Sequence, residues 1–339
     1  MYPNRFTFPS PSFEHYWKDG HGKIMLQKLD KIPALAEIEQ NIPKLFEFDS
    51  LADRVIEEIY LKLSFKEADS LIQKIISEGI ESQKNVPACL RELFQELDEI
   101  PNWLDSEKFN KGSEFCRRSS AYGLMVLRNY SLMGGYESAA INKPLIFTGA
   151  LKSGPVKRIT DTTEFWINIT GVNALSRKEI GFKSCVKTRL IHAYARVSIL
   201  KNPNWKTEDW GIPLNHCDML ATNLGFSLVF LNGLLTLGFK PTKEEIEGLL
   251  HFWKYVGYLL GIPPNYLPNT EIEAIEKLYA WTITQPASDE DTKTLAKSLM
   301  DEPYYSNFPK YKWQKKIVAE SHLAYNQYFL GEISCKNMN

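Results

Sequence analysis

Residues 176–200 read SRKEIGFKSCVKTRLIHAYARVSIL, and the rest of the chain is organised around them. The stretch opens on a Ser-x-x-Glu pattern, Ser176 to Glu179. This pattern is typical of a helix N-terminus, because each side chain can bond to a backbone N–H near the other residue. The stretch contains no proline, and Asn202-Pro203 follows it closely. We therefore predict one long helix that starts at Ser176 and ends near residue 200.

The middle of this predicted helix carries His192, with Arg189 and Arg196 within one turn of it on the same face. Their positive charges disfavour a second cation, so the imidazole is expected to be neutral, as a metal ligand must be. Two guanidinium groups also suit paired carboxylates, such as the propionates of haem. From the residues alone the alternative stays open: a core histidine bonded to a carbonyl, with both arginines extending to solvent as structural residues.

Composition excludes several classes of protein. With 339 residues and 44% hydrophobic residues, the chain can bury a sizeable core. A formal net charge of −1 lacks the excess of positive charge that is typical of proteins that bind nucleic acid. The five cysteines form no C-x-x-C pair, and the first residues, MYPNRF, lack the order of a secretory signal. We therefore expect reduced thiols in a cytoplasmic protein.

One uncharged run, residues 219–239, is long enough to span a bilayer. It contains asparagine, threonine, serine and glycine residues, which are costly against lipid. A helix that is apolar nearly all round but holds such residues is expected in the core of a bundle, without a stable membrane span. Elsewhere the apolar residues recur at helical spacing, with no sustained β-alternation and no internal repeat. The fold class predicted is all-α.

The chain is expected to form one compact unit with three parts: residues 1–100, an N-terminal arm and amphipathic helices; 101–265, the core; and 266–339, C-terminal helices and a tail. Within the core, Ser153-Gly154-Pro155 starts a helix that carries Arg158, Asp161 and Thr162 on one face. A short connection joins this helix to residues 176–200, so the two should be neighbours. We therefore expect a buried Arg-Asp-Thr cluster opposite His192.

Several motifs together resemble the catalytic domain shared by latex-clearing rubber oxygenases and the MpaB-type oxygenase of mycophenolic acid biosynthesis. Their order and spacing carry the resemblance, over roughly residues 100–265. The motifs are Pro101-x-Trp103-x-Asp105, Arg158-x-x-Asp161-Thr162, Arg189-Leu-Ile-His192-Ala-x-x-Arg196, Trp210-Gly-x-Pro213 and Trp253-x-x-Val-Gly257-x-x-x-Gly261.

The resemblance implies a single helical domain with a globin-like core around haem b. It implies that His192 holds the iron, and that Arg158 and Thr162 lie on the distal side. Arg189 and Arg196 are then expected beside the propionates. The function implied is a haem b-dependent oxygenase that uses O₂ on a small apolar substrate, possibly an intracellular alkene.

The sequence departs from the family pattern at two positions. Asp161 stands where rubber oxygenases have a lysine that can approach the iron. Those enzymes also use an acidic residue in the preceding helix, where a gapless count reaches Asn142. Glu137 is the sole acid between Leu124 and Arg158, and is therefore the local candidate. These departures keep two alternatives open: a haem-binding sensor or carrier without turnover, and a helical interaction protein that has lost haem.

Overall fold

All regular elements of the chain in the computed structural model, which describes residues 3–149 and 154–338, are helices. The α-helices are α1 (Glu14–Lys18), α2 (Gly22–Leu26), α3 (Leu35–Glu39), α4 (Ser50–Val55), α5 (Phe65–Glu78), α6 (Ala88–Asp98), α7 (Ser106–Val126), α8 (Met133–Tyr136), α9 (Ala139–Phe147), α10 (Pro155–Thr170), α11 (Ile180–Leu200), α12 (Thr207–Trp210), α13 (His216–Leu224), α14 (Phe230–Thr236), α15 (Lys243–Leu259), α16 (Glu271–Thr282), α17 (Glu290–Tyr305) and α18 (Lys312–Asn337). Short 3₁₀ segments are η1 (Ile42–Phe46) and η3 (Ile80–Ser82), and π segments are η2 (Ile56–Tyr60), η4 (Leu127–Leu132) and η5 (Gly225–Val229). The predicted all-α class is confirmed.

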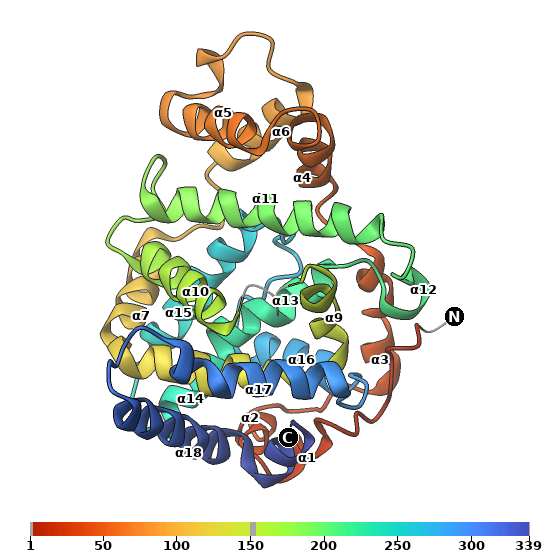
Figure 1. Cartoon of the computed structure of the whole chain (residues 1–339), viewed down its shortest axis with the longest axis vertical. Helices are drawn as coiled ribbons and strands as arrows, with labels where there is room; N and C mark the ends of the chain where they lie inside the picture. The colour runs from red at the N-terminus through yellow and green to blue at the C-terminus, as the bar shows by residue number, and fades with distance from the viewer. Residues whose placement is uncertain (1–2, 150–153, 339) are drawn as a thin grey trace.

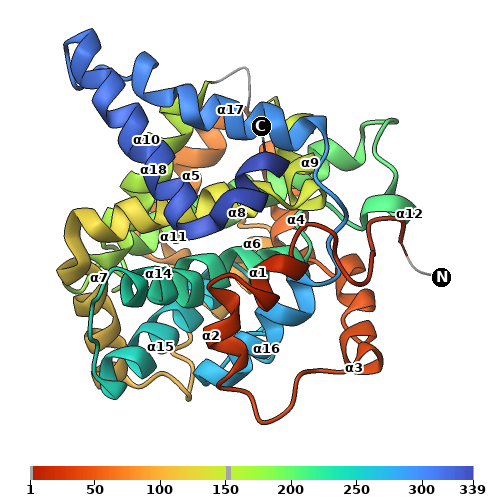
Figure 2. The same cartoon turned by 90° about the horizontal axis from the view of Figure 1, so that it is seen from below.

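Helix α11 crosses the molecule and separates a small outer group of helices from the main body. In Figure 1, α4, α5 and α6 lie above α11, while α9, α10, α13 and α17 lie below it. Figure 2 shows the N-terminal helices α1 and α2 beside α16, close to the last turns of α18. There His15 Nε2 lies 2.8 Å from the Ser334 hydroxyl, so the two ends of the chain meet. The N-terminal segment therefore packs on the C-terminal end of the chain.

Helices α7 and α15 pack closely in the body and meet at two glycines. A Cβ added to Gly112 would lie 2.0 Å from the carbonyl oxygen of Gly248. Two backbones can approach this closely only where neither residue carries a side chain. The large core cluster packs around this contact and includes Phe115, Phe230 and Trp253.

The predicted uncharged helix exists as α13, η5 and α14, which follow one another without interruption. Within the described residues, His216–Thr236 is the one helix long and apolar enough to cross a membrane, and 67% of that window is buried inside the protein. Its π segment packs on η4, where the Ser131 hydroxyl donates to the carbonyl of Gly225 at 2.7 Å. The burial is that of a core helix; the expectation that the chain has no membrane span stays a prediction.

The start of α11 differs from the prediction. The helix begins at Ile180, and Ser176 to Glu179 form a turn in which the Glu179 N–H donates to the Ser176 carbonyl. Lys178 has a φ of +77°, which a right-handed helix cannot contain. The helix ends at Leu200, and its predicted end is confirmed.

Candidate functional site

His192 lies in the middle of α11 and is partly buried. Its Nδ1 atom is buried, and no described residue bonds to it. Burial lowers the pKa of His192 to about 4, and the positive charge of Arg196 adds to the effect. The imidazole is therefore neutral near pH 7. The alternative of a core histidine bonded to a carbonyl is not what the described residues show.

The two arginines beside His192 are buried in ion pairs. Arg189 bonds Asp49 through Nε at 2.6 Å and Glu96 through Nη1 at 2.8 Å. Arg196 lies 2.6 Å from the Asp53 carboxylate and also donates to the backbone carbonyls of Leu214 and Asp49.

These contacts correct the expectation that Arg189 and Arg196 are available for haem propionates, because carboxylates of this chain already occupy both guanidinium groups. Nor do the arginines extend to solvent, since their side chains are 3% and 2% exposed. The ion pairs join α11 to α4 and α6, which is a structural role.

The position of Asp49 also accounts for Gly261, a glycine of the sequence motifs. Gly261 follows α15 with a φ of +85°, and a Cβ there would lie 2.2 Å from the Asp49 carboxylate and 2.8 Å from Arg189 Nε. A side chain would therefore be strained by its backbone and would clash with the ion pair. Gly261 lets the chain pass close to the charges that hold α11.

Helices α10 and α11 are neighbours, as predicted, joined near the turn between them. The Asn168 amide donates to the Ser184 hydroxyl at 3.3 Å. From this contact α10 runs away from α11 toward its own N-terminus (Figure 1). Among the described residues, no hydrogen bond or ion pair connects Arg158 or Thr162 to the His192 ring.

The predicted cluster of Arg158, Asp161 and Thr162 is not formed. Asp161 is exposed and pairs with Lys157 one turn earlier, at 2.6 Å. Arg158 instead lies over the ring of Tyr136 on α8, with its Cζ atom 5.0 Å from the ring centre. Asp161 therefore lies on the solvent-exposed face of α10, where it forms an i,i+4 ion pair with Lys157. Thr162 is partly buried.

Glu137 is buried against the C-terminal helix. Its carboxylate accepts from the Asn337 amide at 2.8 Å and is also bonded by Ser334. Burial raises the pKa of Glu137 to about 7, against the lowering effect of these two bonds. The carboxylate is thus held by α18 and has no bond to α10 or α11, which corrects its placement as a catalytic acid of the site.

Asn142, the position reached by the gapless count, is fully buried in α9. Its amide nitrogen donates to the Tyr136 carbonyl at 2.7 Å and to the Thr292 hydroxyl at 3.3 Å. Its Oδ1 atom is buried and unpartnered among the described residues, as is the indole Nε1 of Trp166 on α10. Within the described part of the chain, buried polar atoms without partners therefore occur on α9, α10 and α11, as they also do on α1, η4 and α15. The sequence gives no sign that Asn142 Oδ1 and Trp166 Nε1 lack partners, because a motif does not report hydrogen bonds.

A family model described as the ER-bound oxygenase mpaB/B'/rubber oxygenase catalytic domain matches residues 117–336. The chain belongs to this family. The match begins later than the motifs suggested and reaches further, into the C-terminal helices beyond residue 265. The resemblance read from the sequence is confirmed.

Two known proteins are similar to the chain. The rubber oxygenase of Streptomyces sp. (strain K30) is 26% identical over 189 residues, which cover 55% of this chain and 46% of that protein. The chain thus matches about half the length of that relative. The structure of a latex clearing protein in the closed state has the same fold, with a TM-score of 0.66 at 20% identity, covering 87% of this chain and 78% of that one.

Proposed function

We propose that the protein is a haem b-dependent oxygenase that uses O₂ on an apolar substrate. Membership of the oxygenase family supports the reaction class. The observation that carries the haem assignment is His192, a neutral imidazole whose buried Nδ1 has no partner among the described residues. A buried polar atom normally finds a partner, so we propose that this nitrogen, which has none among the described residues, marks the place of a bound group.

The residues present fit a haem better than a bare metal ion. Within the described residues there is no group of three or more His, Cys, Asp or Glu side chains that could hold a metal. A haem would need a single imidazole nitrogen from the protein, because the porphyrin itself supplies the other nitrogen ligands of the iron. His192 would provide that nitrogen. When bound, haem supplies the capacity to bind and activate dioxygen.

The remaining residues of the site define what the protein itself contributes. Arg158 brings a positive charge held over Tyr136, and Thr162 brings a hydroxyl group on the same helix. Asn142 can accept a hydrogen bond through its unpartnered oxygen but, as an amide, cannot remove a proton from a substrate. We therefore propose a reaction in which no carboxylate at this position acts as a base.

The substrate is proposed to be small and apolar, with an alkene as one candidate. The support is the family and the named activity of the Streptomyces relative. Because the lysine and acid of the rubber oxygenases are both replaced, we do not expect the chain to act on rubber in the same way.

A haem-binding protein without turnover is the second candidate. It is favoured by two observations: Asp161 is turned to solvent and paired with Lys157, and Glu137 is bonded to α18. In this case the protein would hold haem through His192 and would use it for sensing or transport.

Absorption spectra of the purified, haem-reconstituted protein test the ligand assignment. We expect a Soret band in the wild type and its loss or disruption in His192→Ala. His21→Ala, which removes a histidine bonded to the Tyr328 carbonyl far from α11 in the sequence, serves as the control and should keep the band. An unchanged spectrum in His192→Ala would refute the assignment.

Incubation of the ferrous protein with candidate alkenes under ¹⁸O₂ separates the two functions. Incorporation of label into a product supports the oxygenase. A stable haem spectrum with no O₂ consumption and no labelled product across the alkenes selects the non-catalytic candidate.

A further inference from the structure

A group of exposed aromatic residues lies where α17 ends and α18 begins. Five aromatic side chains fall between residues 304 and 313, and each of them is at least 48% exposed. They are Tyr304, Tyr305, Phe308, Tyr311 and Trp313. One turn later on α18, Ile317 adds an exposed aliphatic side chain. Single exposed apolar residues are normal on a protein surface, whereas a contiguous group of this size is typical of a surface that contacts another molecule or a membrane.

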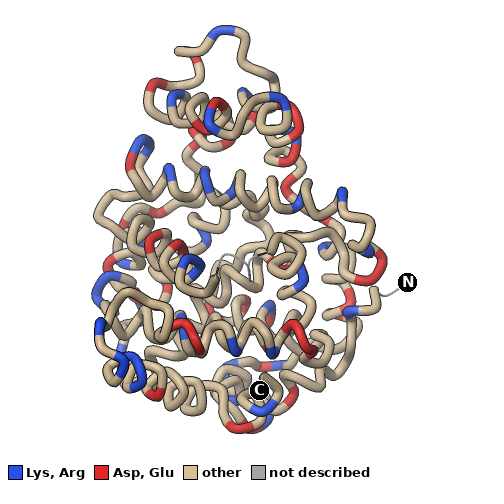
Figure 3. The backbone as a smooth tube through the Cα atoms, in the orientation of Figure 1, with Lys and Arg blue, Asp and Glu red and all other residues tan. Residues whose placement is uncertain are grey.

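The same segment carries positive charge without negative charge. Residues 303–319 contain four lysines and no aspartate or glutamate, in a chain whose formal net charge is −1. The lysines are Lys310, Lys312, Lys315 and Lys316. In Figure 3 the blue of lysine marks this connection and the first turns of α18, at the lower left. Together with Ile317 and the five aromatic residues, these lysines form the basic aromatic patch.

The acidic residues on either side do not neutralise the basic aromatic patch. Asp301 pairs with Lys297 on α17 at 2.8 Å, and the buried Glu302 pairs with Arg128 at 3.2 Å. Glu320 follows the patch on α18 and is exposed. Among the described residues, none of the four lysines of the patch forms an ion pair with a carboxylate. Their charge is therefore available to a partner.

The turn that presents the patch is held by hydrogen bonds. The ammonium group of Lys315 donates to the backbone carbonyls of Tyr304 at 3.1 Å and Ser306 at 2.6 Å. The Ser306 hydroxyl donates to the Glu302 carboxylate, which ties the turn to the buried end of α17. Figure 2 shows the connection from α17 to α18 at the upper left, where it projects from the body. The aromatic rings are therefore presented outward by an ordered turn.

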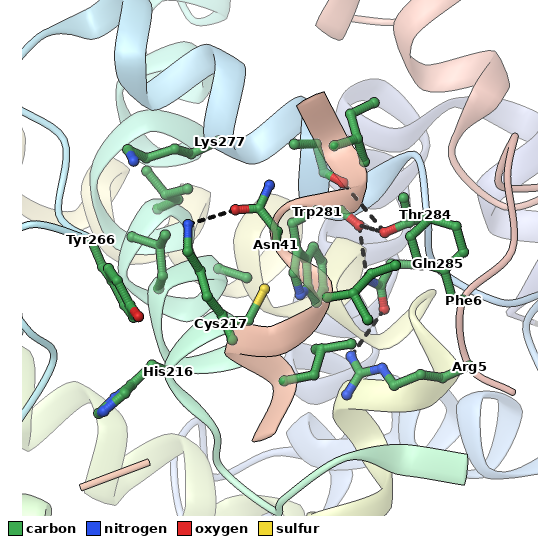
Figure 4. Close-up of a pocket in the computed structure, with 18 residues that line it drawn as sticks. Arg5, Phe6, Asn41, His216, Cys217, Tyr266, Lys277, Trp281, Thr284 and Gln285 are labelled. Carbon is green, nitrogen blue, oxygen red and sulfur yellow. Dashed lines mark hydrogen bonds between the residues drawn. The ribbon is translucent and has the colours of Figure 1, made fainter. Parts of the chain in front are cut away.

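The lysines around the cleft between the N-terminal arm, η1, α13 and α16 have a different setting (Figure 4). Glu273 and Glu276 act on Lys277 from its own helix, and Lys44 donates to the Asn41 side chain at 2.7 Å. This cleft has a volume of about 40 Å³, which is room for a few water molecules. The basic aromatic patch differs from it, because it combines exposed apolar surface with charge that no carboxylate offsets.

We propose that the basic aromatic patch docks the protein on an anionic phospholipid bilayer. Tryptophan and tyrosine favour the interface between a membrane and water, because their rings are apolar and their N–H or O–H groups can bond to headgroups. Lysines beside them attract anionic headgroups. The contact is peripheral: the turn would enter the interface, and no helix would cross the bilayer. This surface is separate from the oxygenase proposal and does not require haem.

Two other occupants fit the patch less well. A second copy of the chain would bring its own four lysines against these four, and like charges placed opposite one another oppose association. Proteins bind single-stranded nucleic acid in a basic groove that follows the phosphate backbone, whereas this patch is a projecting turn (Figure 2). Both occupants are outcomes that the experiment distinguishes.

Co-sedimentation of the full chain with lipid vesicles tests the proposal. Vesicles of phosphatidylcholine alone are compared with vesicles of equal parts phosphatidylcholine and phosphatidylglycerol. We expect the partition coefficient to be at least about tenfold higher on the anionic vesicles, because each lysine near an anionic surface contributes about fivefold. Raising NaCl from about 0.1 M to about 1 M should remove most of this difference, because salt screens exposed charges.

Two sets of substitutions separate the charge of the patch from its apolar surface. The triple variant Lys310→Gln, Lys312→Gln and Lys316→Gln should weaken binding to anionic vesicles about 100-fold. Lysine to arginine at the same three positions keeps the charge and should keep the binding. Phe308→Ala together with Trp313→Ala should weaken binding about tenfold or more, because two apolar side chains no longer enter the interface.

Matched controls lie at the other end of the molecule, in and before α5 (Figure 1). The triple variant Lys62→Gln, Lys66→Gln and Lys74→Gln changes the net charge by the same amount, and Leu63→Ala with Phe65→Ala removes two exposed apolar side chains. Both should bind anionic vesicles as the wild type does. Melting temperatures equal to that of the wild type show that each variant is folded, as expected for exposed side chains.

Three results would overturn the proposal: equal binding to both kinds of vesicle, unchanged binding in either patch variant, or an equal loss in the α5 controls. Patch-dependent self-association in sedimentation velocity, without binding to vesicles, would select a second copy of the chain instead. Patch-dependent binding of a single-stranded oligonucleotide, again without binding to vesicles, would select nucleic acid.

Discussion

Glu137 should make the protein less stable as the pH rises. The side chain is 1% exposed, and burial raises its pKa from an ordinary 4.5 to about 7. Between these two values the folded protein holds a proton that the unfolded chain has released. The contribution of Glu137 to stability is therefore fully present below about pH 4.5 and is lost as the pH rises to about 7. At about 1.4 kcal/mol per pH unit, the full loss is on the order of 3 kcal/mol.

Glu137→Gln removes this charge and keeps the bonds. The glutamine oxygen can still accept from Asn337, and its amide can donate to the Ser334 hydroxyl. The gain in unfolding free energy of the variant over the wild type should grow by about 2.5 kcal/mol between pH 5 and pH 8.

Urea unfolding of both proteins at pH 5, 6, 7 and 8 measures this difference. His15, which shares Ser334, has a pKa lowered by burial and acts in the opposite sense. It is present in both proteins, so the difference between them isolates Glu137. Glu164→Gln changes an exposed glutamate on α10 and should follow the wild type at every pH. Parallel curves for Glu137→Gln and the wild type would refute the reasoning.

Two further substitutions test the packing around the site. Arg196→Met should lower the unfolding free energy by about 3–5 kcal/mol, because it leaves the Asp53 carboxylate buried without its partner. Urea unfolding measures this loss. As the control, Lys157→Met, which removes the exposed pair with Asp161, should change the unfolding free energy little. Gly112→Ala should lower the unfolding free energy by at least about 1–3 kcal/mol, because the added Cβ would lie 2.0 Å from the Gly248 carbonyl oxygen. Thermal unfolding measures this loss. A melting temperature equal to that of the wild type would contradict the close contact between α7 and α15.

Features encoded locally were predictable from the sequence. The end of α11 follows from Asn202-Pro203, and the buried helix that overlaps residues 219–239 follows from the uncharged composition of that run. The start of α11 was missed because a capping box needs regular backbone after Ser176, whereas Lys178 adopts a positive φ. A pattern of residue types does not report a single unusual dihedral angle.

The partners of the site residues could not be predicted, because they lie far away in the sequence. Asp49 meets Arg189 across 140 positions, and Asp53 meets Arg196 across 143. Glu137 was selected because it was the nearest acid in the sequence, yet it bonds Asn337 200 residues later. The cytoplasmic location and the absence of nucleic-acid partners stay predictions.

The ion pairs of Arg189 and Arg196 affect the orientation of His192. Arg189 precedes the histidine by three residues and Arg196 follows it by four, so each lies about one turn away along α11. Both are anchored to the segment around α4, by Asp49 on one side and Asp53 on the other. A helix held at two points on one face cannot rotate about its axis between them, so the direction of the imidazole is set before any ligand binds. The Arg-x-x-His-x-x-x-Arg spacing is then explained because both arginines fix the orientation of the helix that carries the His192 imidazole. That orientation depends on Asp49 and Asp53, which lie outside the motif.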